Sequence, residues 1–171
     1  MGRTRAAVLD GAARAVAVAG ARRTTMADIA AAAGIAKGTL YNHFRTKEAV
    51  FAAALEHSVE RLSDDAAKCA AESGLAAGLA LAARGIGESP ALTRLRDEPA
   101  ALLPILTVGD DGVWSTARDG VNGVLAAGGG RTDAAATDIA LRWLVSHAAA
   151  PGGDVEGAAH ALAACLVTQG D

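Results

Sequence analysis

Aromatic residues are scarce in this chain, whose 171 residues include 2 Phe, 2 Trp and 1 Tyr against 45 Ala. β-Strands favour aromatic and β-branched side chains, whereas Ala has the highest helix propensity of all residues. A hydrophobic fraction of 51% against 20% charged residues excludes a disordered chain. The composition therefore predicts an all-α protein that is long enough to bury a core.

Cysteines and long apolar runs are scarce as well. Cys69 and Cys165 lie far apart, which fits neither a disulfide framework nor a metal-binding motif. The longest uncharged run, from Gly157 to Gly170, has 14 residues and is too short to cross a bilayer. We expect a soluble, cytoplasmic protein that does not associate with membranes and holds no metal or resident cofactor.

The net charge of -3 conceals an asymmetry along the chain. Residues 1 to 50 hold eight basic and three acidic side chains, a balance of +5, whereas the remainder holds eight basic and sixteen acidic ones, a balance of -8. A basic head on an acidic body is typical of a protein whose head binds a polyanion. The alternative is a chance distribution of solvated charges.

The apolar spacing predicts three helices in the head. The first spans about Arg5 to Val18. Thr25 and Asp28 have the spacing of a capping box for a second helix, Met26 to Ala33, which a glycine ends. The third runs from about Lys37 to Phe44. Two short helices joined by a glycine-containing turn form a helix-turn-helix pattern.

The polar residues of the third helix are not explained by packing. The apolar residues that pack the two short helices on the first are Ile29, Ala33, Ile35, Leu40 and Phe44. The outward polar residues are Lys37, Thr39, Tyr41, Asn42 and His43, with Lys47 just beyond. Their donors suit phosphate oxygens and base edges, and the major groove of DNA admits such a helix.

The body is predicted to consist of further helices. Thr46 can cap a long one that links head to body, and its apolar stripe is Phe51, Leu55, Val59, Leu62, Ala66 and Cys69. Pro104 predicts a kink or a break in a later helix. Thr132 and Asp154 are expected to open the last two helices. The inner face of the first of these is expected to be Ala136, Ile139, Ala140, Trp143, Leu144 and His147.

The segment from Thr25 to Val50, TMADIAAAAGIAKGTLYNHFRTKEAV, resembles the DNA-binding domain of the TetR family of transcriptional regulators. The most specific part is Gly38-Thr39-Leu40-Tyr41, followed by His43-Phe44 and then by Lys47. The resemblance implies a helix-turn-helix DNA-binding domain at residues 1-48. It also implies a helical effector-binding and dimerisation domain at residues 49-171.

The resemblance implies a role for each of eight residues. Lys37, Gly38, Thr39 and Asn42 would face bases, whereas Thr25, Tyr41, His43 and Lys47 would hold phosphates. The chain departs from the family pattern at Ala36, where a Ser, Thr or acidic residue is usual. The recognition helix is therefore expected to begin without a side-chain cap.

Few side chains of the body have distinctive chemistry. The candidates for an effector pocket are Trp114, Trp143 and His147, although Trp143 also fits a place in the core. Cys69 lies on an apolar stripe and is expected in the core. His57 lies off that stripe and is expected in solvent.

The function implied by the resemblance is that of a ligand-responsive, dimeric repressor that binds a palindromic operator in double-stranded DNA. A homodimer is also favoured physically, because one short helix reads few base pairs. The effector would be a small molecule of unknown identity. The alternative is a DNA-binding protein that needs no effector or is controlled by a partner protein. The chain has no phosphate-binding glycine loop and no GxSxG motif, so we expect no enzyme and no catalytic residues.

Overall fold

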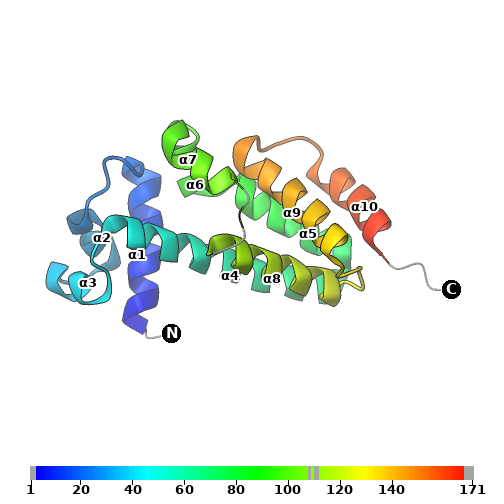
Figure 1. Cartoon of the computed structure of the whole chain (residues 1–171), viewed down its shortest axis with the longest axis horizontal. Coiled ribbons are helices and arrows are strands. Elements are labelled where there is room, and N and C mark those ends of the chain that lie inside the picture. The colour runs from blue at the N-terminus through cyan, green and yellow to red at the C-terminus, as the bar shows by residue number, and fades with distance from the viewer. Residues whose placement is uncertain (1–2, 108, 110–111, 168–171) are drawn as a thin grey trace. The chain divides into compact units, whose positions relative to one another are not determined.

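The computed structural model describes residues 3–107, 109 and 112–167 (Figure 1). Its helices are α1 (Arg3–Ala19), α2 (Met26–Ala33), α3 (Lys37–His43), α4 (Lys47–Ser73), α5 (Leu75–Gly87), α6 (Pro90–Leu95), α7 (Pro99–Leu106), α8 (Val113–Ala127), α9 (Ala134–Ala149) and α10 (Val155–Leu166). The described ranges hold no strand beyond an isolated bridge between Gly130 and Val167. The all-α class is thus confirmed. None of the described helices has the length and apolarity needed to cross a membrane.

The chain divides into two compact units. The first comprises residues 1–58 and 89–107, and the second comprises residues 59–88 and 108–171. Helices α6 and α7 therefore belong with the N-terminal helices, although they follow α5 in the sequence. The expected boundary after residue 48 concerns a division of function and stays a prediction.

Two buried clusters hold the first unit together. Helices α1 to α3 and the start of α4 surround Val8, Leu9, Ala12, Ala15, Ile29, Ala30, Leu40, Phe44, Val50 and Ala54. Ala33 and Ile35 pack against this cluster while partly buried. The second cluster consists of Val16, Leu95 and Leu102, and it joins α1 to α6 and α7. The packing expected for the two short helices is confirmed.

The second unit is built around α5, which packs on α8, α9 and α10. Its core includes Leu75, Leu79, Val124, Leu125, Leu141, Leu144 and Leu166. The last turns of α4 enter this core through Ala66 and Ala70. A Cβ on Gly78 of α5 would lie 2.7 Å from the Ala66 carbonyl oxygen, so the two helices meet almost backbone to backbone.

This close approach corrects the expected stripe of α4. Ala66 is buried as predicted, but Phe51, Leu55, Val59, Leu62 and Cys69 are only partly buried. The fully buried positions are Val50, Ala54, Ala66 and Ala70. Ala66 and Ala70 are small because α5 comes too near for larger side chains, whereas Val50 and Ala54 are buried in the core of the first unit.

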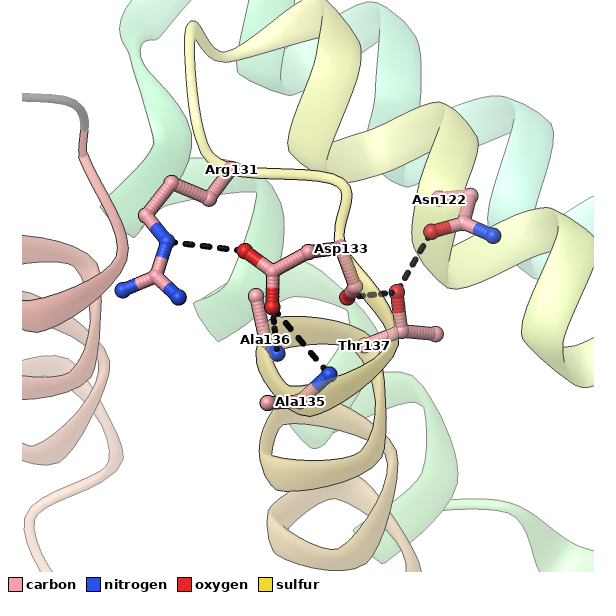
Figure 2. Close-up of polar contacts among 6 residues, drawn as sticks. All are labelled: Asn122, Arg131, Asp133, Ala135, Ala136 and Thr137. Atoms are coloured by element: carbon pink, nitrogen blue, oxygen red, sulfur yellow. Dashed lines mark hydrogen bonds and ion pairs between the residues drawn. The ribbon is translucent and has the colours of Figure 1, made fainter.

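The start of α9 differs by one residue from the expectation (Figure 2). Asp133, rather than Thr132, is the capping residue, because its Oδ1 accepts from the N–H groups of Ala135 and Ala136, each at 3.1 Å. The hydrogen bond from Arg131 to the other carboxylate oxygen is the main reason why the pKa of Asp133 lies below its usual value. Thr137 is buried, and its Oγ1 lies 2.5 Å from Oδ1 of Asn122 on α8.

Three further expectations concern helices of the body. α7 is not broken at Pro104, since it continues to Leu106 and the Thr107 N–H still bonds to the Leu103 carbonyl. Ile139 was expected on the inner face of α9 but is 52% exposed, because α9 buries Thr137 and Leu141 instead. Asp154 caps α10 as predicted, through the Gly157 N–H at 2.8 Å.

Candidate nucleic-acid interface

The start of α2 is fixed by a capping box. Thr25 Oγ1 accepts from the Asp28 N–H at 3.3 Å, and Asp28 Oδ2 accepts from the Thr25 N–H at 2.9 Å. The hydroxyl of Thr25 also donates to this carboxylate at 2.7 Å, and that bond is the main cause of a lowered Asp28 pKa. Gly34 ends the helix in the left-handed conformation with φ 68°. Both features confirm the predictions made from the local sequence.

Helix α3 turns Leu40 inward and its polar residues outward. Leu40 is fully buried, whereas Lys37, Gly38, Tyr41, Asn42 and His43 are exposed and Thr39 is partly exposed. Ala36 makes no side-chain capping bond, as expected. The structure thus brings six of the eight predicted contact residues together on α3.

Lys37 and Tyr41 lie one turn apart on α3 and contact each other. The ammonium of Lys37 is 5.8 Å from the centroid of the Tyr41 ring, a cation–π arrangement on a ring that is 45% exposed. Because the two side chains share one exposed face, a predicted base contact and a predicted phosphate contact lie side by side.

Gly38 has no structural reason to be glycine within the described structure. No heavy atom of another element lies within 4 Å of the place where its Cβ would be. A glycine inside a helix costs about 1 kcal/mol relative to Ala. The residue therefore weakens α3 without relieving any internal contact, which leaves the space beside it for something outside the chain.

Lys47 and Thr25 already have partners inside the protein. The ammonium of Lys47 donates to the carbonyls of Ala21 at 3.2 Å and of Arg22 and Thr24 at 3.3 Å. The Thr25 hydroxyl is part of the capping box. The sequence motif does not indicate this second role of Lys47. This role could have been suspected because the carbonyls in the turn before α2 have no helical N–H group to accept from and need another donor.

Of the three residues proposed for an effector pocket, His147 lines the pocket that described residues form in the second unit. In the second unit, an open pocket of about 410 Å³ is bordered by His147 and by Arg84, Glu88, Pro151 and Glu156. The side chain of Arg84 is ion-paired with Glu156. His147 is 7% exposed, and burial lowers the pKa of its imidazole, which is therefore neutral at pH 7.

The two tryptophans lie elsewhere in the second unit. Trp114 is buried in the core. Trp143 packs against that core and meets the His147 ring edge to face, with centroids 4.9 Å apart and an angle of 82°. Trp143 therefore contacts His147, a residue of the pocket, but is not itself one of the residues that line this pocket.

His57 is largely buried, although the sequence predicts that it lies in solvent. Its side chain is 15% exposed, and Nε2 lies 4.0 Å from Asp10 Oδ1. Asp10 is on α1, so this approach is set by the packing of α1 and α4 within the first unit. A periodicity read along α4 alone does not reveal it.

Comparison with known proteins gives matches to the head and to the fold. Residues 8–54 match the family described as bacterial regulatory proteins, tetR family. The TetR family repressor AlkX from Dietzia sp. strain DQ12-45-1b, implicated in biodegradation of n-alkanes, is 21% identical over 93% of each chain, with a TM-score of 0.74. No curated protein sequence matches the chain.

Two other solved structures share the fold. A TetR transcriptional regulator from Rhodococcus sp. RHA1 is 20% identical over 95% of each chain, with a TM-score of 0.59. The transcriptional regulator FadR from Bacillus subtilis, solved in complex with stearoyl-CoA, is 17% identical over 95% of this chain and 97% of its own, with a TM-score of 0.52.

Proposed function

We propose that this chain, a DNA-binding transcriptional regulator of the TetR family by its N-terminal domain, is a ligand-responsive repressor that binds a palindromic operator as a homodimer. The observation that carries operator binding is the outward face of α3. There a cation, an amide, a hydroxyl and an unexplained glycine lie within two turns of one another.

Each exposed residue of α3 suits one kind of DNA contact. Lys37 and Asn42 have the donors for guanine and adenine edges, and Thr39 can also face a base. Gly38 allows the helix backbone to approach the groove. Tyr41 and His43 extend exposed donors that suit phosphate oxygens. Thr25 and Lys47 would contact phosphates from side chains that also hold the start of α2.

Operator binding is tested with a site selected from a pool of random duplexes. We expect wild type to enrich a palindrome, and Lys37→Ala or Asn42→Ala to lose about 1 to 3 kcal/mol of binding free energy, with relaxed preference at one position of each half-site. Affinity is measured by fluorescence anisotropy at several salt concentrations.

A matched control is Lys68→Ala, because Lys68 is an exposed lysine in the part of α4 that belongs to the second unit. This variant should bind like wild type. If wild type enriches no sequence and binds no duplex at low salt, where phosphate contacts are strongest, the proposed function is wrong.

The dimer would form through α9 and α10. Ile139 of α9 is exposed and Trp143 is partly exposed, while α10 leaves Ala158, Ala161 and Cys165 exposed. Small side chains allow helices from two copies to approach closely. A dimer places two copies of α3 on half-sites about one helical turn apart.

The effector would bind in the pocket beside His147. A volume of about 410 Å³ lies in the range of small-molecule sites. The alternative remains a DNA-binding protein that needs no effector or is controlled by a partner protein. An effector would release DNA only to the extent that it binds the released conformation more tightly. Release of labelled operator by candidate compounds is the measurement that identifies it.

A further inference from the structure

The turn between α1 and α2, residues 20–24, is held by two side chains of opposite charge. Lys47 donates to the carbonyls of Ala21, Arg22 and Thr24. Glu98 Oε2 accepts from the backbone N–H of Arg22 at 3.1 Å. The ammonium of Lys47 thus bonds to carbonyl oxygens of the turn, and the carboxylate of Glu98 bonds to one of its N–H groups. All of these residues belong to the first unit.

The backbone of Glu98 is fixed at the junction of α6 and α7. Its N–H donates to the Leu95 carbonyl at 2.8 Å, and its carbonyl accepts from the N–H groups of Ala101 at 2.8 Å and Leu102 at 3.1 Å. Glu98 stands at the capping position of α7, yet its side chain makes no capping bond. Its carboxylate is used on the turn instead of on its own helix.

The turn is shaped to receive this carboxylate. Gly20 has φ 81°, and a Cβ there would overlap the Glu98 carboxylate. Thr24 is buried, and its hydroxyl donates to the Gly20 carbonyl at 2.6 Å. Thr25, the first residue of the capping box, follows directly. Glu98 therefore contacts the turn that leads directly into the first residue of α2's capping box.

The segment that carries Glu98 links both units along the chain. Leu95 and Leu102 bury it against Val16 of α1. Immediately before it, Gly87 and Glu88 end α5 and border the pocket of the second unit, and Ser89 caps α6.

We propose that Glu98 is a positioning residue for operator binding, which couples the α6–α7 segment to the start of the helix-turn-helix. This inference rests on the proposed DNA-binding function. By thermodynamic reciprocity, a contact that lets α6 and α7 affect DNA affinity also lets DNA affect α6 and α7. The coupling is therefore measurable without knowing the effector.

The experiment compares Glu98→Ala with Glu98→Gln and Asp97→Ala in the full chain. Gln keeps an oxygen that can accept from the Arg22 N–H. Asp97 is the adjacent carboxylate in the same junction and pairs with Arg94 instead of with the turn. Operator affinity is measured by anisotropy, and amide hydrogen exchange is followed with and without operator.

We expect Glu98→Ala to bind the operator about tenfold more weakly, with faster exchange at the Arg22 amide. In wild type, operator binding should slow exchange across residues 89–106, and Glu98→Ala should lose this effect. Glu98→Gln should restore most of both signals, and Asp97→Ala should behave like wild type. A merely structural role would lower the melting temperature without uncoupling residues 89–106 from DNA.

Two results would overturn the inference in different ways. If wild type binds its operator and Glu98→Ala matches it in affinity and in protection of residues 89–106, Glu98 does not position the head. If wild type binds no DNA at all, the proposed function fails and this inference fails with it.

Discussion

Gly38 shows how a single residue can serve binding at the expense of its own helix. It is the second residue of α3, with open space where a side chain would be. Ala would strengthen the helix and meet no internal obstacle. At this position, helix stability favours Ala, whereas the proposed DNA contact favours Gly.

We expect Gly38→Ala to raise the free energy of unfolding by up to about 1 kcal/mol and to weaken operator binding, because the added methyl group enters the space reserved for the groove. Urea unfolding and anisotropy measure the two effects. Gly123→Ala is the control, since Gly123 lies in α8 with equally open space. It should gain similar stability and bind DNA unchanged. Full affinity of Gly38→Ala would remove this argument for the interface.

At the scale of helices, the pairing of α8 with α9 depends on a polar contact as well as on apolar burial. The buried hydroxyl of Thr137 meets the side-chain oxygen of Asn122 at the first turn of α9. Asn122 is itself partly buried. Loss of the hydroxyl would leave this oxygen without that donor.

We expect Thr137→Val to lower the free energy of unfolding by about 1 to 3 kcal/mol, because a partly buried acceptor loses its bond. The comparison is Thr132→Val, an exposed threonine five residues earlier that does not cap the helix. This second variant should change stability by less than about 0.5 kcal/mol. Equal effects of the two in urea unfolding would show that the contact between Thr137 and Asn122 does not stabilise the pairing of α8 with α9.

Features that depend on local chemistry could be predicted from the sequence. The capping box of Thr25 and Asp28, the stop at Gly34 and the cap at Asp154 each involve residues within a few positions of one another. Choosing between Thr132 and Asp133 failed, because both residue types cap helices and they are adjacent.

Features that depend on distant partners could not be predicted. His57 approaches Asp10 of α1, and the bonds of Lys47 are made to a turn more than twenty residues earlier. Glu98 bonds to a backbone group of Arg22, which no side-chain pattern marks. The motif thus indicated the outward residues of α3, while the contacts that hold the turn before α2 required the structure.

At the scale of the whole molecule, operator recognition depends on the proposed pairing of two copies. Ile139 is a large apolar side chain exposed on α9, the helix that also carries the partly exposed Trp143. Burial against a second copy would remove this apolar surface from water.

We expect Ile139→Glu to be a monomer at concentrations where wild type is a dimer, because a carboxylate would be buried in the interface. Sedimentation equilibrium measures the change, and operator affinity should fall with it. Leu103→Glu is the control, since Leu103 is also exposed but lies on α7 in the first unit. A dimer of unchanged stability for Ile139→Glu would place the interface elsewhere.

The late position of α6 and α7 in the sequence also sets an order for events on the ribosome. Val16 reaches its buried partners Leu95 and Leu102 only after residue 106 and its neighbours have left the exit tunnel. Helices α9 and α10 emerge from the tunnel after that point. A nascent chain can therefore fold its first unit before the helices of the proposed dimer have left the ribosome. We expect such a chain, which is still a monomer, to leave the operator unoccupied.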